Sequence, residues 1–252
     1  MKIQTTQAKK HFGQNFLTNQ DVLTKIIENS QIQEEDFVLE IGPGTANLTQ
    51  LINQKTDRYL GLEIDETLMP FLKDYNVKFE DSLRFDIRDL PDKYKLIANI
   101  PYYITSPILN HYLMQSYINS WPMPKFMILM VQKEFAQKLT TTKKSNLLQT
   151  SISCVADVEY LFTVPSKDFD PAPKVDSAII KITPNPKIPK DVEFKKFWSF
   201  LKILHSNPRK TIKNNLKSLK KDLSQIPEET LKKRRENLSL EDCLNLFNLL
   251  KH

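Results

Sequence analysis

The chain is poor in cysteine and histidine, and the few it has are scattered. Its two cysteines, Cys154 and Cys243, lie far apart and form no Cys-x-x-Cys pair, and its four histidines are equally dispersed. This spacing argues against a disulfide framework and against a metal site. No apolar run approaches membrane-spanning length, and the basic, polar stretch from Met1 to Phe16 lacks the apolar segment of a signal peptide. We therefore expect a protein of the reducing cytoplasm with no metal and no membrane partner.

The composition indicates a globular protein with an uneven distribution of charge. The chain has 252 residues, of which 40% are hydrophobic and 26% charged, enough for one large domain or a main domain with a small one. The net charge is +6, yet residues 184–252 hold 16 Lys and Arg against 8 Asp and Glu, whereas residues 1–183 hold 20 against 22. This asymmetry indicates a polyanionic partner for the C-terminal part, although a basic solvated face explains a modest excess equally well.

The first glycine-rich segment follows a predicted strand. Phe37 to Ile41 predicts a buried strand, and Gly42-Pro43-Gly44 comes directly after it. Glycines at a strand-to-helix junction let a ligand approach the backbone, and the helix expected from Ala46 directs its positive end there. A second strand, Tyr59 to Asp65, places Glu63 where an acid accepts hydrogen bonds from ribose hydroxyls. The Gly-x-Gly-x-x-Gly pattern that binds a pyrophosphate is absent, which favours a cofactor with adenosine and no pyrophosphate, such as S-adenosylmethionine.

Two further strands end in polar residues. Asn76 to Asp81 ends in Asp81, a candidate acceptor for the exocyclic amine of an adenine. The apolar run Leu96 to Ala98 ends in Asn99-Ile100-Pro101-Tyr102, at the carboxyl end where ligands of open α/β sheets bind. Pro101 pushes the residue before it toward extended geometry, so we expect the Asn99 amide oxygen and the Ile100 carbonyl to face one point beside an aromatic ring. Two oxygen acceptors beside an aromatic ring suit a planar base with an exocyclic amine. The alternative is that these residues end the strand and only close a turn.

Three more strands complete a sheet of seven. They are predicted at Phe126 to Val131, Asp157 to Pro165 and Ser177 to Pro184. Between the last two, prolines stiffen the loop Phe169 to Asp176, with Phe169 at its head in position to present a ring. Seven strands with interleaved helices predict an α/β fold, a Rossmann-like doubly wound sheet closed by a hairpin.

The two ends of the chain differ from this pattern. The segment Met1 to Gln20 predicts a basic arm that contains Lys9 and Lys10. This arm leads into a helix capped by Thr18 or Asn19. The proline-rich segment Pro184 to Pro189 predicts a linker into a small all-helical C-terminal domain. There the apolar positions Ile212, Leu216, Leu219 and Leu223 recur at helical spacing. We expect domains at 1–183 and 184–252.

Six motifs occur in order along the chain: Gly13-Gln14-Asn15-Phe16-Leu17, Glu40-Ile41-Gly42-Pro43-Gly44, Glu63-Ile64-Asp65, Asn99-Ile100-Pro101-Tyr102, Val131-Gln132-Lys133-Glu134 and Phe169 to Ser177. This set spans essentially the whole chain and resembles the ribosomal RNA adenine N6-dimethyltransferase family. Arg209 to Leu216 and Arg235 to Ser239 further resemble its small-subunit (16S, kasugamycin-sensitivity) branch. The large-subunit branch that confers macrolide resistance is the nearer alternative.

The resemblance implies a substrate, a cofactor and a set of site residues. The substrate is adenines, two adjacent ones each dimethylated, in the small-subunit ribosomal RNA of an immature 30S-type particle, and the protein acts as a monomer. The expected cofactor residues, which include the two glycines discussed above, are Asn15, Leu17, Gly42, Gly44, Glu63, Asp81 and Asn99. The expected residues for the target adenine are Asn99, Ile100, Pro101, Tyr102 and Phe169. The expected RNA-binding residues are Lys9, Lys10, Arg209, Lys210, Lys213, Lys232, Lys233, Arg234 and Arg235.

The chain departs from the family pattern at a few positions. Ala46 stands where a second glycine is common, and Pro208 stands where a basic residue is usual. Thr140 to Asn146 replaces a glycine- and tyrosine-containing loop, and Pro70 is expected to kink or shorten the helix after Asp65. An RNA-binding assembly factor with secondary or lost catalysis is the alternative from another class, and the glycine pattern disfavours a nicotinamide oxidoreductase.

Overall fold

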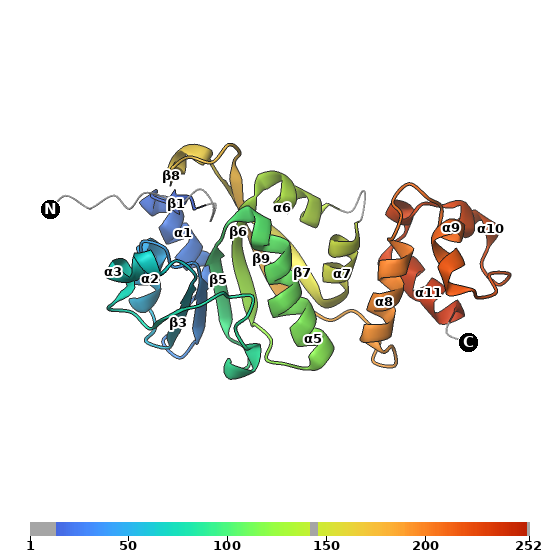
Figure 1. Cartoon of the computed structure of the whole chain (residues 1–252), viewed down its shortest axis with the longest axis horizontal. Coiled ribbons are helices and arrows are strands. Elements are labelled where there is room, and N and C mark those ends of the chain that lie inside the picture. Colours follow the sequence, from blue (N-terminus) through green and yellow to red (C-terminus); the bar gives the residue numbers. More distant parts are fainter. Residues whose placement is uncertain (1–13, 142–145, 251–252) are drawn as a thin grey trace. The chain divides into compact units, whose positions relative to one another are not determined.

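The structure of the chain is a computed structural model that describes residues 14–141 and 146–250. It divides into two compact units, one of residues 1–137 and 158–184 and one of residues 138–157 and 185–252 (Figure 1). The first unit ends one residue beyond the boundary predicted from the sequence. Residues 138–157, which the sequence assigned to the first domain, group with the second unit.

A seven-stranded sheet forms the core of the first unit, and its strands coincide with the seven predicted ones. The strand order is β4-β3-β2-β5-β6-β9-β7. Neighbours from β4 to β6 run parallel, and β9 runs antiparallel to β6. The predicted Rossmann-like fold is therefore confirmed. The strands are β2 (Val38–Ile41), β3 (Tyr59–Glu63), β4 (Val77–Phe79), β5 (Lys95–Asn99), β6 (Phe126–Gln132), β7 (Ala156–Val164) and β9 (Ser177–Pro184).

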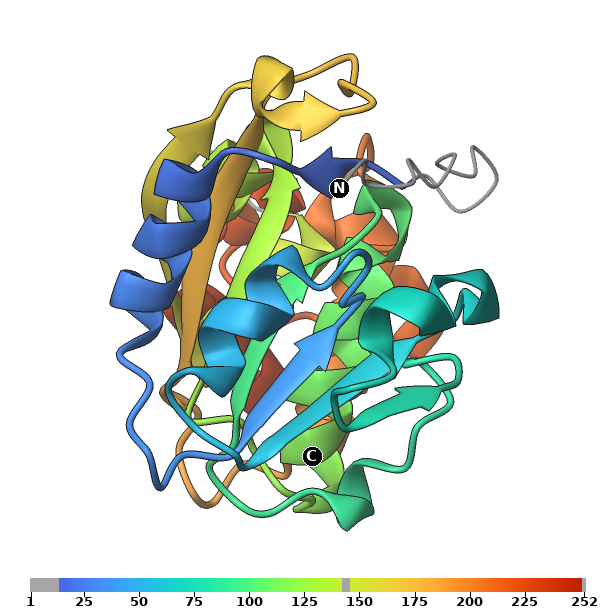
Figure 2. The ribbon, with the colours of Figure 1, turned by 90° about the vertical axis from the view of Figure 1, so that its left-hand side faces the viewer.

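Helices cover both faces of this sheet, as Figure 2 shows. The central strands β2, β5 and β6 are buried on both faces, except at the last residues of β5 and β6. This burial explains why their sequences are continuous apolar runs instead of alternating patterns. On one face, apolar residues of α1 (Gln20–Ser30) and α2 (Asn47–Asn53) pack on Val38, Ile97 and Ile128. The remaining helices of this unit are α3 (Met69–Leu72), α4 (Thr105–Leu109), α5 (Ser116–Asn119) and the first part of α6 (Lys133–Thr140), whose last three residues group with the second unit.

The beginning of the described chain is tied to the loop before β9. Asn19 caps α1, as predicted, because its side chain accepts hydrogen bonds from the backbone of Asp21 and Val22. Just before it, β1 (Phe16–Leu17) pairs antiparallel with β8 (Phe169–Asp170). The sequence did not predict this two-stranded sheet, since two residues are too few for a periodic pattern.

Two helical segments of the first unit are irregular. The helix after Asp65 is short, one of the two outcomes expected from Pro70: a 3₁₀ turn, Glu66–Leu68, leads into the four residues of α3. Pro70 lies in the first turn of α3, where the missing N–H is harmless. After α4, residues Asn110–Gln115 form a π-helix that continues into α5. Such π segments are rare and occur often at functional sites.

The second unit is helical apart from the start of β7. Its helices are α7 (Leu147–Val155), α8 (Phe194–Leu204), α9 (Ile212–Leu216), α10 (Glu228–Lys232) and α11 (Leu240–Leu249). The helix predicted from Ile212 to Leu223 was too long: α9 ends at Leu216, a 3₁₀ turn follows, and Lys220 adopts a left-handed conformation. The apolar positions Ile212 and Leu216 are buried as expected. Across residues 14–141 and 146–250, no helix is long and apolar enough to cross a membrane.

Candidate functional site

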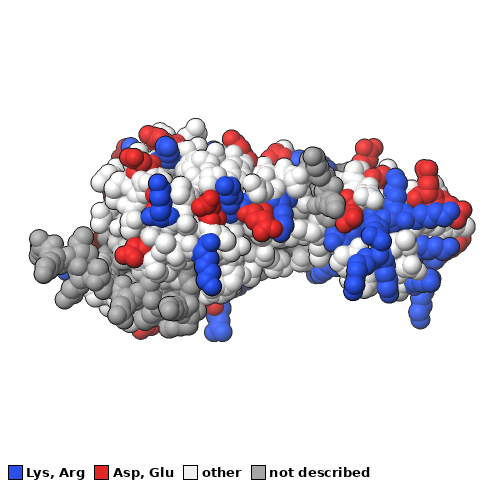
Figure 3. Space-filling view, turned by 90° about the horizontal axis from the view of Figure 1, so that it is seen from above, with Lys and Arg blue, Asp and Glu red and all other residues white. Residues whose placement is uncertain are grey.

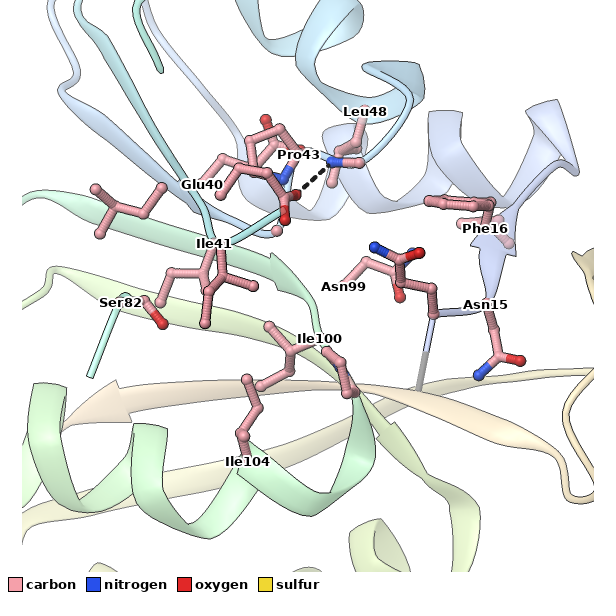
Figure 4. Close-up of a pocket in the computed structure, with 18 of the residues that line it drawn as sticks. Asn15, Phe16, Glu40, Ile41, Pro43, Leu48, Ser82, Asn99, Ile100 and Ile104 are labelled. Carbon is pink, nitrogen blue, oxygen red and sulfur yellow. Dashed lines mark hydrogen bonds between the residues drawn. The ribbon is translucent and has the colours of Figure 1, made fainter. Parts of the chain in front are cut away.

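A cavity of about 300 Å³ opens at the carboxyl ends of the central strands (Figure 4). Segments that follow β2, β3, β4 and β5 line it, together with residues of β1 and β8. All residues predicted for the cofactor and the target adenine lie on its wall: Asn15, Leu17, Gly42, Gly44, Glu63, Asp81, Asn99, Ile100, Pro101, Tyr102 and Phe169. The structure thus brings together residues that are up to 154 positions apart in the sequence.

The glycine segment after β2 brings the backbone close to the cavity. Gly42 and Gly44 both have positive φ, at 73° and 60°. A Cβ on Gly42 would lie 3.4 Å from the Asn99 carbonyl oxygen, and one on Gly44 would lie 3.2 Å from the Phe16 ring. Side chains at these positions would strain the backbone and narrow the cavity.

The predicted ribose acid, Glu63, is held by backbone donors. Its carboxylate accepts hydrogen bonds from the N–H groups of Gly44, at 3.1 Å, and Asp65, at 3.0 Å. Burial raises the pKa of this carboxyl, and the backbone bonds act against the shift. A carboxylate has about four acceptor positions, so two remain for a ligand. Asp81 accepts a hydrogen bond from the N–H of Leu83 at 2.9 Å and keeps a third of its side chain exposed.

Glu40 is a site residue that the sequence analysis placed in a motif but gave no role. It lines the cavity and is 2% exposed. Thr49 and Tyr59 donate hydrogen bonds to the same oxygen, Oε2, at 2.7 and 2.6 Å. Burial raises the pKa of Glu40 to about 7, against these two bonds, and the nearby Glu63 adds to the rise. An acidic residue inside a strand otherwise made of apolar residues was the available signal.

The turn after β5 combines free acceptors with an anchored ring. No hydrogen bond to the Asn99 side chain or to the Ile100 carbonyl forms within the described part of the chain. The Tyr102 hydroxyl, by contrast, lies 2.7 Å from Oγ of Ser177, a residue with no exposed surface. Burial raises the pKa of Tyr102. Acceptors without internal partners are the groups that remain to bind an exocyclic amine.

Phe169 takes a different environment from the one its loop position suggested. It is 5% exposed and belongs to the same apolar cluster as Leu17, with which it pairs between β8 and β1. Additional bonds fix this arrangement: the side chain of Asn47 donates to the Leu17 carbonyl at 2.9 Å, and Thr18 donates to the Asp168 carbonyl. The Phe169 ring is therefore accessible only to a ligand that has entered the cavity.

The loop that carries Asp81 is held by the π-helix. Tyr112 donates a hydrogen bond of 2.7 Å to the Ser82 carbonyl, and Nε2 of His111 lies 3.0 Å from the Phe85 carbonyl. Two consecutive residues of the π segment thus position two carbonyls of one turn. Neither residue could be predicted from the sequence, because nothing local in the sequence connects residues 82–85 with 111–112.

The predicted RNA-binding residues of the second unit form one basic surface. These residues come from two segments, 209–213 and 232–235. A backbone bridge joins the segments between Thr211 and Arg234, and the N–H of Ile212 donates a hydrogen bond to the Lys233 carbonyl. Figure 3 shows a dense group of Lys and Arg on this part of the molecule. Exposed members are Arg209, Lys210, Lys213, Lys232, Lys233 and Arg234. Arg235 differs, because it is half-buried. Burial lowers the pKa of His205 to about 4, and the charge of Arg235 adds to this shift. Lys9 and Lys10 lie outside the described residues.

These observations define the class of protein first: a Rossmann-like α/β protein with a ligand-sized cavity at the carboxyl edge of its sheet. Within residues 14–141 and 146–250, no group of His, Cys, Asp and Glu is placed to hold a metal ion. The chain belongs to the ribosomal RNA adenine dimethylase family, because the sequence model of that family matches residues 5–252. The family identified from the sequence motifs is thereby confirmed.

Individual relatives agree with this assignment. The chain is 37% identical to the ribosomal RNA small subunit methyltransferase A of Fusobacterium nucleatum, over 96% of this chain and 97% of the relative. It is 38% identical to the protein of the same name from Chlorobium phaeobacteroides, over 96% and 94%. Among solved structures, a dimethyladenosine transferase from Plasmodium falciparum has a TM-score of 0.74 at 26% identity, covering 94% of this chain and 98% of that one. The 23S rRNA methyltransferase ErmE shares the fold, with a TM-score of 0.73 at 24% identity and 94% and 100% coverage.

Proposed function

We propose that this enzyme transfers methyl groups from S-adenosylmethionine to N6 of adenines in small-subunit ribosomal RNA, dimethylating two adjacent adenines during ribosome biogenesis. The observation that carries the proposal is the turn Asn99 to Tyr102, which presents two acceptors without internal partners beside an anchored ring in the cavity. The curated relatives quoted above carry the name of this activity.

The cofactor side of the cavity fits S-adenosylmethionine. The backbone at Gly42 and Gly44 leaves room that a Cβ would fill, Glu63 has acceptor positions for ribose hydroxyls, and Asp81 offers a partly exposed carboxylate for an adenine amine. Asn15 and Leu17 complete the wall. When bound, the sulfonium supplies an already activated methyl group.

The chain's own residues act mainly on the nucleophile. The lone pair of an adenine N6 is delocalised into the ring, which makes the amine a poor nucleophile. When the Asn99 amide oxygen and the Ile100 carbonyl accept both amino hydrogens, they favour the pyramidal nitrogen of the transition state. Tyr102 and Phe169 hold the base between them after it leaves its RNA surroundings. No strong base is required, since the proton leaves to solvent after transfer.

The basic surface of the second unit supports the choice of a structured RNA. Lysines and arginines along two joined segments bind phosphates by charge and shape without reading sequence. We infer an immature 30S-type particle in the cytoplasm as the partner. As the family resemblance implies, we propose that the protein acts as a monomer.

The test is transfer of labelled methyl groups to small subunits that lack the modification, with large-subunit RNA as the parallel substrate. We expect label on adenine N6 of the small-subunit RNA alone. Label in the large-subunit RNA alone would assign the protein to the other branch. Tight subunit binding without label would favour an assembly factor that has lost catalysis.

A further inference from the structure

Tyr103 is exposed to an extent that the proposed site does not explain. Its side chain is 65% exposed, the highest value among the exposed large hydrophobic residues in the described part of the chain. It nevertheless lines the same cavity as its neighbour Tyr102. A large ring kept in water at the edge of a binding cavity indicates a surface that a ligand covers.

The two consecutive tyrosines point in different directions. They lie in the 3₁₀ turn Tyr102–Ile104, in which successive side chains are separated by about 120°. Because Tyr102 is fixed to the buried Ser177 through its hydroxyl, Tyr103 is turned away from this anchor toward solvent. Tyr102 therefore serves the interior of the cavity and Tyr103 its rim.

The cofactor does not account for this ring. The other exposed large hydrophobic residue of the lining, Ile64, directly follows the ribose acid Glu63 at the end of β3, so the cofactor's base is its expected cover. Tyr103 follows β5, which is separated from β3 by β2. Two strand spacings amount to roughly 10 Å, which places Tyr103 on the side of the target adenine.

We propose that Tyr103 is a second base-binding site, on which the nucleobase next to the target adenine stacks. This inference rests on the proposed function, because a target adenine in the cavity carries its neighbour to the rim through a single phosphodiester link. Every base offers a π-face to an aromatic ring, so the site needs no sequence-specific contacts. Because the bound strand has one polarity, Tyr103 contacts the neighbour on one side of the target only. Where two adjacent adenines are both substrates, it therefore binds the other adenine during one of the two modifications and the flanking base during the other.

The inference is tested with Tyr103→Ala and Tyr103→Phe on unmethylated small subunits. We expect Tyr103→Ala to raise KM about tenfold with kcat and cofactor affinity within twofold of the wild type, and Tyr103→Phe to behave as the wild type. The second substrate is a subunit reconstituted with RNA that lacks only the base beside the target. On this second substrate the KM of the wild type should rise about as much as the KM of Tyr103→Ala rises on the intact substrate. The two increases in KM should not add when the variant meets the second substrate.

A binding measurement gives an independent readout. With 2-aminopurine beside the target, wild type and Tyr103→Phe should quench its fluorescence, whereas Tyr103→Ala should not. Tyr160→Ala, on the outermost strand β7, is the matched control and should leave KM and quenching unchanged. The inference would be overturned if Tyr103→Ala raised KM over the wild type by the same factor on both substrates. It would also be overturned if the variant left KM and quenching unchanged. If the wild type itself methylates no adenine, the proposed function fails instead.

Discussion

The two halves of the cavity differ in how their polar groups are satisfied. On the cofactor side, the carboxylates of Glu40 and Glu63 each accept two hydrogen bonds from the protein itself. On the target side, the acceptors of Asn99 and Ile100 have no such partner in the described chain. One half is therefore organised before a ligand arrives, and the other is completed by the substrate. Variants should accordingly act on cofactor affinity and stability in the first half and on the rate of transfer in the second.

The largest effect is expected from Asn99→Ala. Loss of the amide oxygen removes one of two acceptors for the reacting amine, and such transition-state contacts contribute about 10³-fold in rate. We expect kcat for methyl transfer to fall by that factor while RNA affinity stays within about threefold. Asn119→Ala, at the exposed end of α5, is the control. A variant that transfers methyl groups at nearly the wild-type rate would contradict the proposed role.

The buried Glu40 should make stability depend on pH. Its pKa is about 7 in the folded protein against an ordinary value of 4.5, so the folded state holds the proton more tightly than the unfolded chain. Stability therefore falls as pH rises from about 4.5 to 7, by about 3 kcal/mol for the full shift. In Glu40→Gln the amide oxygen still accepts from Thr49 and Tyr59 but does not titrate.

Denaturant unfolding of wild type and Glu40→Gln at pH 5 and pH 8 measures this effect. The difference in unfolding free energy between the two proteins should shift by about 3 kcal/mol between these pH values, with the variant gaining relative stability at pH 8. Contributions from titrating groups that do not interact with Glu40 cancel in this difference, whereas that of the nearby Glu63 is included in it. A pH-independent difference would show that Glu40 is ionised in both states.

The sequence predicted the sheet and the pocket wall well, because both depend on local patterns. Buried strands read as apolar runs, and polar residues directly after them mark the binding edge. The supporting contacts were missed because they join residues such as Tyr102 and Ser177, which are 75 positions apart.

Ala46 shows the same limit at one position. It adopts the left-handed conformation in which glycine is favoured, with φ of 65°. The sequence alone flagged the departure from glycine but not the compensation: the Ala46 methyl group is buried against Leu68 and Leu72. Contacts of this kind follow from the folded arrangement only.

On the target side, Ser177→Ala should have a moderate effect. It leaves the half-buried Tyr102 hydroxyl without its partner, so the ring that holds the adenine loses its fixed orientation. We expect kcat to fall about fivefold with unchanged cofactor affinity. Tyr102→Phe removes the same bond, so the double variant should be no worse than either single one, as a double-mutant cycle would show. Additive losses would mean that Ser177 acts by another route.

On the cofactor side, the smallest effect should come from Tyr112→Phe. The substitution keeps the buried ring and removes only the bond to the Ser82 carbonyl, which helps hold the turn that carries Asp81. A bond of this kind contributes about 1 kcal/mol, so the cofactor Kd from calorimetry should rise roughly fivefold while kcat at saturating cofactor stays constant. Tyr94→Phe is the matched control, because its hydroxyl is also buried but has no hydrogen-bond partner among the described residues. An unchanged Kd in Tyr112→Phe would show that the turn keeps its shape without the π-helix.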